Sequence, residues 1–183
     1  DNYEKALEVY RKGVEYVDEK NKSLLSDFYG QMGDLYYHME KTDSAFIIYD
    51  KALEYNPNNL GVLNNYSYFL SVAKKDLPRA ERMSSITIKA DPANPTYLDT
   101  YGWVLFQQKA YLIAKIYIQN AIEYSKNKGE DISAEVYEHY GDVLYKTDEH
   151  EEALEYWIKA KEKGDSKSKT LEKKIETQTY IEE

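Results

Sequence analysis

One arrangement of large and small residues, repeated along the chain, constrains its fold more than any other feature of the sequence. Large, large, small and large residues spaced i, i+3, i+4 and i+7 predict one face of a first helix, and an alanine-containing set predicts a second helix. In the first unit these residues are Tyr29, Met32, Gly33 and Tyr36, then Ala45, Tyr49 and Ala52, and finally Pro57. Each unit is therefore expected to be a helical hairpin.

The same register returns three more times. Its members are Leu63, Tyr66, Ser67 and Leu70 with Ala80, Ser84 and Thr87; Leu98, Tyr101, Gly102 and Leu105 with Ala114, Ile118 and Ala121; and Tyr137, Tyr140, Gly141 and Leu144 with Ala153, Trp157 and Ala160. The small residue of the first helix falls at positions 33, 67, 102 and 141, so the units repeat after 34, 35 and 39 residues. A single hairpin presents more apolar surface than it can bury alone, so it stacks on its neighbours. The sequence predicts an all-α solenoid.

We expect one continuous solenoid domain, divided at its turns. The predicted segments are 1–25 (the second helix of a truncated repeat, with a linker), 26–59, 60–94, 95–133 (with a longer loop at 127–133), 134–165, and 166–183 (a terminal capping helix). Asp76 with Pro78, and Asn94 with Pro95, are expected to begin helices, because each pair combines a capping side chain with a proline that suits a first helical turn.

The first predicted segment matches only a second helix. Ala6, Tyr10 and Gly13 take the places of the small, large and small residues that mark the second helix of the first complete unit. The chain is therefore expected to begin in the middle of a repeat and to be a fragment of a longer protein.

These repeats resemble the tetratricopeptide repeat (TPR) family over essentially the whole chain, and they are similar to those of a bacterial-type TPR protein. The resemblance implies a right-handed α-α superhelix of antiparallel helix hairpins. It also implies a scaffold for protein–protein interaction, which binds a partner peptide or protein segment in its concave groove and performs no catalysis.

In this family, a flank of each first helix lines the groove. Carrying the helical register along the chain assigns to the groove Asp34, Tyr37, Asn64, Asn65, Tyr68, Asp99, Trp103, Phe106, Glu138, Asp142 and Tyr145. Trp103 and Phe106 are expected to form an exposed aromatic patch; the alternative is that they pack against the neighbouring unit or the loop at 127–133. Asn64 and Asn65 are suited to bond the backbone of a bound peptide, as asparagines do in some family members.

The acidic groove residues also indicate the kind of partner. Some TPR domains hold a C-terminal carboxylate with Lys, Arg and Asn side chains, but the matching stripe here carries Asp34, Asp99, Glu138 and Asp142, which would repel a carboxylate. A partner with basic or aromatic character is therefore expected.

Composition and motifs weigh against other classes of function. The net charge is −9, from 24 basic and 33 acidic residues, and no Lys/Arg cluster marks a nucleic-acid site. No apolar run is long enough for a membrane span, so we expect a soluble chain, located in the cytoplasm or, where a leader has been removed, in the periplasm or envelope. There is no cysteine, and the three histidines lack metal-ligand spacing, so no metal or cofactor is expected.

No catalytic motif occurs in the sequence, and we expect the protein not to be an enzyme. Two alternatives stay open. The first is an architectural role, in which the array spaces or dimerises the domains of a larger protein through self-association. The second, more remote, is a hydrolase that uses paired carboxylates of the groove.

Overall fold

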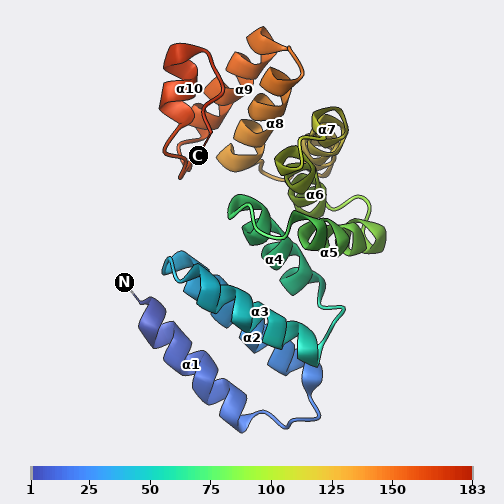
Figure 1. The fold of residues 1–183 in the computed structure, drawn as a ribbon, viewed down its shortest axis with the longest axis vertical. Helices are drawn as coiled ribbons and strands as arrows, with labels where there is room; N and C mark the ends of the chain where they lie inside the picture. Colours follow the sequence, from blue (N-terminus) through green and yellow to red (C-terminus); the bar gives the residue numbers. More distant parts are fainter. Residues whose placement is uncertain (1, 183) are drawn as a thin grey trace.

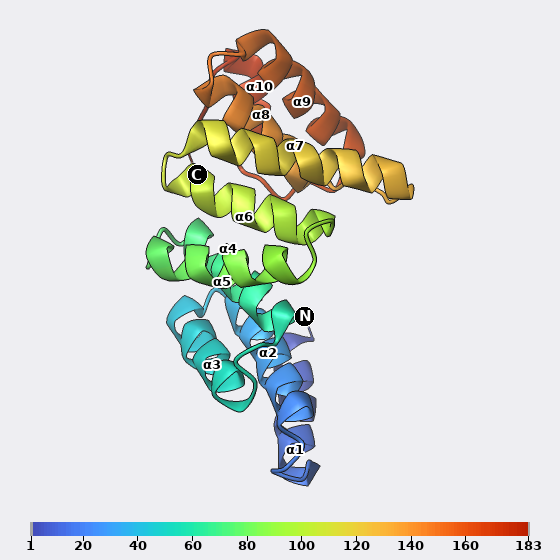
Figure 2. The ribbon, with the colours of Figure 1, turned by 90° about the vertical axis from the view of Figure 1, so that its right-hand side faces the viewer.

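The computed structural model describes residues 2–182, which form ten helices and no strand. Their bounds are α1 (Tyr3–Tyr16), α2 (Lys22–His38), α3 (Thr42–Tyr55), α4 (Leu60–Val72), α5 (Leu77–Ala90), α6 (Pro95–Gln107), α7 (Tyr111–Lys128), α8 (Ala134–Lys146), α9 (His150–Lys163) and α10 (Leu171–Thr177). Helices α2/α3, α4/α5, α6/α7 and α8/α9 pair as hairpins, α1 packs on α2, and α10 packs on α9 (Figure 1). Figure 2 shows the hairpins stacked in succession from α1 to α10. The predicted all-α solenoid is confirmed.

The predicted helix starts are confirmed at both proline-containing turns. The carboxylate of Asp76 accepts a hydrogen bond from the backbone N–H of Arg79 at 3.2 Å, and Pro78 lies in the first turn of α5. The amide oxygen of Asn94 caps α6 in the same way, and Pro95 is the first residue of that helix. Side-chain caps satisfy N–H groups that have no partner within the helix, so these residues fix where α5 and α6 begin.

The small residues of the repeat let two helices of a hairpin approach closely. A Cβ atom added to Gly33 would lie 2.7 Å from the Tyr49 ring, and one added to Gly141 would lie 2.5 Å from the Trp157 indole. Tyr49 and Trp157 are completely buried. In the first and fourth units the repeat pattern therefore packs a ring of the second helix against a glycine of the first, and in the third unit Ile118 takes the place of the ring beside Gly102.

The turn before α8 differs from the sequence prediction. The predicted loop at 127–133 is shorter, because residues 127 and 128 continue α7, and Gly129, with a φ of 69°, ends that helix in the left-handed conformation. Within the remaining loop, Ile132 is buried against the core of the last hairpins.

The C-terminal helix is also shorter than the predicted segment 166–183. It spans only Leu171–Thr177, because the Ser168 hydroxyl accepts the backbone N–H of Leu171 at 3.2 Å and Gln178 adopts a left-handed conformation at the other end. Residues 1 and 183, at the outer ends of the first and last predicted segments, lie outside the described residues. Among residues 2–182, no helix has the length and apolar character needed to cross a membrane.

Candidate functional site

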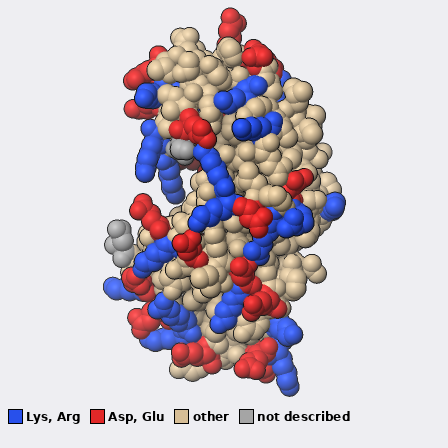
Figure 3. All heavy atoms as spheres, viewed as in Figure 1, with Lys and Arg blue, Asp and Glu red and all other residues tan. Residues whose placement is uncertain are grey.

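The first helices of the hairpins line a cavity on the inner side of the array. This groove cavity has a volume of about 490 Å³ and lies between α2, α4, α6, α8 and the C-terminal segment 165–182. Its wall includes Tyr37, Tyr68, Phe69, Trp103, Glu135 and His139. Figure 3 shows Lys and Arg side chains mixed with Asp and Glu over the face of the molecule, with no large region of one sign. The cavity is therefore distinguished from the rest of this face by the aromatic side chains in its wall and not by its charge.

Stacked rings form the wall of the groove cavity. Tyr37 stacks on Phe69 with ring centroids 3.7 Å apart. Trp103 lies between two rings, 3.8 Å from His139 and 4.7 Å from Phe106. The indole N–H of Trp103 is buried and has no acceptor in the described part of the chain. The wall thus contains a set of stacked rings and one unsatisfied hydrogen-bond donor.

A hydrogen bond joins the two ends of this wall. The Tyr68 hydroxyl donates to the carboxylate of Glu135, so α4 is tied to α8 although α6 lies between them in the array. Glu135 itself is exposed and forms no ion pair with any residue from 2 to 182. It is therefore a carboxylate of the cavity that forms no direct ion pair within residues 2–182.

His139 carries a positive charge inside the wall. Its Nδ1 lies 3.1 Å from both carboxylate oxygens of Asp99, and both side chains are buried. Burial by itself disfavours the imidazolium, but attraction to Asp99, assisted by Glu135 and Asp142, outweighs it and raises the pKa of His139 to about 9. Asp99 is therefore committed to an internal ion pair at neutral pH.

A lysine of the C-terminal helix neutralises two more carboxylates. The Lys174 side chain is only 3% exposed, and its Nζ lies 2.8 Å from Glu138 and 2.7 Å from Asp142. Asp142 also accepts a hydrogen bond from the Trp157 indole at 2.9 Å. Burial raises the pKa of Asp142 to about 6 although Lys174 opposes the shift, and the two carboxylates raise the pKa of Lys174 against the effect of its own burial.

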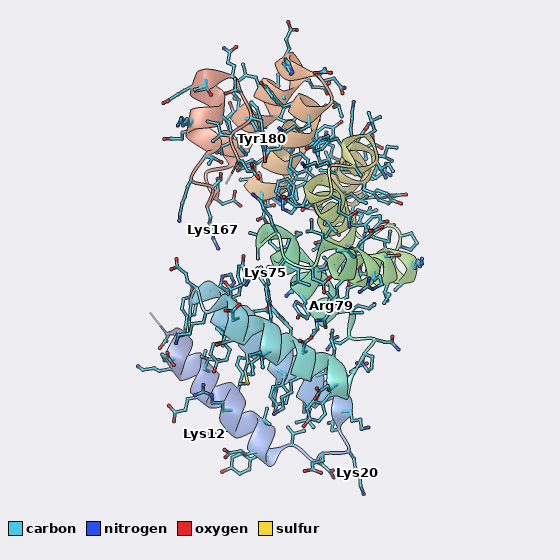
Figure 4. All side chains as sticks on the ribbon, viewed as in Figure 1. Lys12, Lys20, Lys75, Arg79, Lys167 and Tyr180 are labelled. Atoms are coloured by element: carbon cyan, nitrogen blue, oxygen red, sulfur yellow. The ribbon has the colours of Figure 1, made fainter. Side chains whose placement is uncertain are left out.

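The residues that follow α10 reach from Lys174 toward α6 along the groove cavity. Tyr180 lies between α10 and α8 in Figure 4, with its ring centroid 5.8 Å from that of Phe106 and the Lys146 ammonium 4.0 Å above it. Glu182 pairs with Lys74 at the end of α4. The C-terminal segment therefore forms one side of the groove cavity.

The structure corrects part of the predicted groove. The expectation that Asp99, Glu138 and Asp142 give an open acidic surface is wrong, because each is buried and paired with a cation of this chain. The expected exposure of Phe106 is also wrong, since this ring is 3% exposed and packs between Trp103 and the C-terminal segment.

Other predicted groove residues occupy different places. Tyr37, Tyr68 and Trp103 do line the groove cavity, and their binding role stays a prediction. Asp34 accepts hydrogen bonds from Tyr49 and Asn65, and burial raises its pKa while those bonds oppose the shift.

The two remaining predicted residues differ in their surroundings. Asn64 is buried on α4 beside a second cavity, whereas Tyr145 on α8 stacks on His150 with ring centroids 4.4 Å apart. Neither of the two side chains lines the groove cavity.

His139 and Lys174 are the residues that sequence reasoning missed. His139 shares a helix face with Glu135 and Asp142, since these positions follow the i, i+4, i+7 spacing, and this signal was present in the sequence. The signal for Lys174 was weaker, since it shares a helix face with Leu171 three residues before it, but nothing in the sequence indicated its carboxylate partners. No group of three or more His, Asp or Glu side chains among the described residues is arranged to hold a metal ion.

Comparison with known proteins places this architecture among characterised repeats. The tetratricopeptide repeat profile matches residues 26–59. A TPR repeat-containing protein of Methanocaldococcus jannaschii is 27% identical over 166 residues; the match covers 91% of this chain but 21% of that protein, so the chain spans about a fifth of its relative's length.

Solved structures that share the fold include the following two. TTC0263, a thermophilic TPR protein of Thermus thermophilus, superposes with a TM-score of 0.71 at 14% identity, covering 96% of this chain and 90% of that one. YrrB, described as a TPR protein with an unusual peptide-binding site, gives a TM-score of 0.61 at 23% identity, covering 86% of this chain and 75% of that one.

Proposed function

We propose that this chain, whose repeats are similar to those of the tetratricopeptide repeat family, is a protein–protein interaction scaffold that binds a peptide or protein segment in the groove cavity and catalyses no reaction. Stacked hairpins of this kind create extended concave surfaces on which partners are bound. The description of YrrB as having a peptide-binding site is in keeping with such a role.

The observation that carries the proposal is the unsatisfied N–H of Trp103. A buried donor without an acceptor destabilises a protein by about 1–3 kcal/mol, and such groups are rare in native structures. Trp103 lies in the wall of the groove cavity, so a carbonyl oxygen of a bound segment would supply the missing acceptor. The rings of Tyr37, Tyr68 and Phe69 would supply apolar contact beside it.

The unpaired Glu135 supports a partner with basic or aromatic character. This carboxylate lines the groove cavity, and a basic side chain would balance its charge. An aromatic side chain would instead extend the stack that Tyr37 and Phe69 begin.

The pairing of the other carboxylates favours a scaffold over a hydrolase. A hydrolase of the kind considered from the sequence requires two carboxylates free to exchange protons with a substrate or water. Asp99 is bound to the imidazolium of His139, and Glu138 and Asp142 are bound to Lys174. These three acids hold elements of the solenoid together.

The test is a peptide selection followed by one conservative substitution. Peptides are selected from a random displayed library on the parent chain, and the affinity of a selected peptide is measured by calorimetry. Trp103→Phe keeps a ring between His139 and Phe106 but removes the N–H, so we expect affinity to fall about tenfold, as the loss of a hydrogen bond worth about 1.4 kcal/mol would produce.

The control is Tyr16→Ala, which removes an aromatic ring that is 89% exposed on α1, outside the groove cavity. Helicity should be unchanged in both variants, and Trp103→Phe should melt no lower than the parent chain, because it removes the buried donor that has no acceptor. Selected peptides that bind Trp103→Phe as tightly as the parent chain would contradict the assignment of the groove. Alanine at Phe106 is unsuitable for this test, because that ring is part of the core.

An architectural role by self-association has one observation in its favour. Leu112, Ile113 and Ile116 form an apolar stripe on α7 and are 74%, 52% and 58% exposed. Sedimentation equilibrium of the parent chain and of an Ile116→Lys variant tests this second candidate. A dimer that Ile116→Lys dissociates would support it, and a monomeric parent chain at high concentration would exclude it.

A further inference from the structure

A second cavity, here called the side pocket, adjoins the groove cavity. It has a volume of about 360 Å³ and lies between α4, α6, the end of α7 and the loop that leads into α8. Its wall includes Asn64, Asn65, Asp99, Glu130, Asp131 and Glu135. Tyr68, Ser133 and Glu135 line both cavities, so a chain bound in the groove cavity passes the mouth of the side pocket.

The hydrogen bonds of two asparagines leave one acceptor without a donor. The carboxylate of Asp34 accepts from the Asn65 amide nitrogen at 3.1 and 3.3 Å, which fixes the Asn65 oxygen on the other side. That oxygen accepts from the Asn64 amide nitrogen at 3.3 Å. The Asn64 oxygen is therefore the end of the series, and it is buried with no donor among residues 2–182.

The direction of this series follows from the charge at its beginning. A carboxylate accepts hydrogen bonds, so Asn65 must present its N–H₂ group to Asp34, and neither amide is free to flip without placing two oxygens against each other. Asn64 is 5% exposed and lines the side pocket. A hydrogen-bond donor of a bound molecule would therefore satisfy the amide oxygen of Asn64.

The charges around the side pocket call for a cation. Four carboxylates line it: Asp99, Glu130, Asp131 and Glu135. The imidazolium of His139 pairs with Asp99, and Lys163 pairs with Asp131. Glu130 and Glu135 have no cation partner within the described part of the chain. None of the lining residues is Lys or Arg.

We propose that the side pocket binds the guanidinium group of an arginine side chain from the partner segment, through hydrogen bonds to Asn64 and charge pairing with Glu130 and Glu135. The proposal rests on the proposed function, because it names a side chain of the segment bound in the groove cavity. A guanidinium offers five N–H donors in one plane and is weakly hydrated, so it satisfies acceptors spread around a cavity, whereas an ammonium is a compact, strongly hydrated charge. The Tyr68 ring at the mouth offers a surface on which a guanidinium stacks.

The test uses N-acetyl-arginine amide as the probe and the full chain labelled with ¹⁵N. Side-chain amide resonances of Asn64 and Asn65 are followed while the probe is titrated. We expect saturable shifts at both amides, and binding at least tenfold weaker for N-acetyl-citrulline amide, which has nearly the same shape without the charge. N-acetyl-lysine amide should also bind at least threefold more weakly than the arginine probe.

Charge-matched variants separate the pocket from the overall field of the protein. Glu135→Gln keeps an acceptor for Tyr68 but removes a charge of the side pocket, and we expect it to weaken the arginine probe threefold to tenfold. Glu155→Gln removes the same charge from an exposed position on α9 and should leave the probe's affinity unchanged.

Three outcomes would overturn the inference: no saturable shift at Asn64, equal binding of the citrulline probe, or equal loss in Glu135→Gln and Glu155→Gln. Equal binding of the lysine probe would overturn the choice of guanidinium. The proposed function fails separately. If selected peptides depend on Trp103 but the arginine probe does not reach Asn64, the groove assignment stands and the side-pocket assignment falls; the reverse result refutes the groove and supports the pocket.

Discussion

The buried charge on His139 should make the stability of the chain fall as the solution becomes alkaline. In the unfolded chain an imidazole has a pKa near 6.5, whereas in the structure Asp99 outweighs burial and raises the pKa of His139 to about 9. A base whose pKa is raised by folding contributes its full stability below the unfolded value and loses it as the pH rises through the folded value. The loss is therefore expected between pH 6.5 and about pH 9.

The size of the effect follows from the two pKa values. A change from 6.5 to about 9 corresponds to roughly 3 kcal/mol of folding free energy. Asp142 does not act in the same range, because its pKa is raised from 3.8 to about 6, so its stabilising contribution is complete at low pH and has been lost once the pH exceeds 6. The alkaline loss can therefore be assigned to His139.

Urea unfolding followed by circular dichroism at 222 nm, at several pH values from 6.5 to 9, measures this loss. The matched control is His139→Gln, which retains a hydrogen-bond donor toward Asp99 but cannot titrate, so its stability should be lower at pH 6.5 and nearly constant over the range. The Cε1 proton of His139, observed by NMR, should titrate near pH 9 in the native chain.

Three results would refute this reasoning: an unfolding free energy of the parent chain that is constant from pH 6.5 to 9, the same pH dependence in His139→Gln, or a native His139 that titrates near pH 6.5. The last result would mean that Asp99 does not offset the effect of burial.

Two further predictions concern the packing of the solenoid. Lys174→Met should lower the unfolding free energy by about 3–5 kcal/mol, because it leaves two buried carboxylates without a cation. Adding Glu138→Gln and Asp142→Asn to this variant should recover most of the loss in thermal melts. If Lys174→Met alone were as stable as the parent chain, the buried ion-pair triad would be contradicted. Gly141→Ala should lower the unfolding free energy measured in urea by about 1–3 kcal/mol, because the added Cβ would overlap the Trp157 indole. The control is Gly61→Ala, whose Cβ would meet no atom closer than 3.5 Å and which should be neutral or stabilising by up to about 1 kcal/mol. Equal effects of the two substitutions would refute the close-packing argument.

The sequence predicts the helices well because their information is local. Glycines such as Gly33, Gly102 and Gly141 mark where a large side chain of the next helix packs, and each lies 12 residues before the alanine that opens that helix. The helix period also places Tyr37, Tyr68 and Trp103 correctly on the groove side, since 100° per residue determines which flank a side chain occupies.

The state of the groove carboxylates was not predictable from the same pattern. Asp99 meets a histidine 40 residues away, and Glu138 meets Lys174, 36 residues away and on a different helix. Apolar periodicity carries no information about which cation reaches an acid across the array. Lys174 lies three residues after Leu171 and so shares its face of the helix, but only the path of the segment before α10 brings that face against Glu138 and Asp142.

The hydrogen bond between Tyr68 and Glu135 has a mechanical consequence. In most solenoids each hairpin contacts only its neighbours, so each interface between two hairpins deforms independently when the array is stretched. Here the bond joins residues 67 positions apart and ties α4 to α8 across the intervening hairpin. A force applied to the two ends would therefore load the α6/α7 hairpin and this bond in parallel, so the middle of the array should be its stiffest part and the outer helices should yield first.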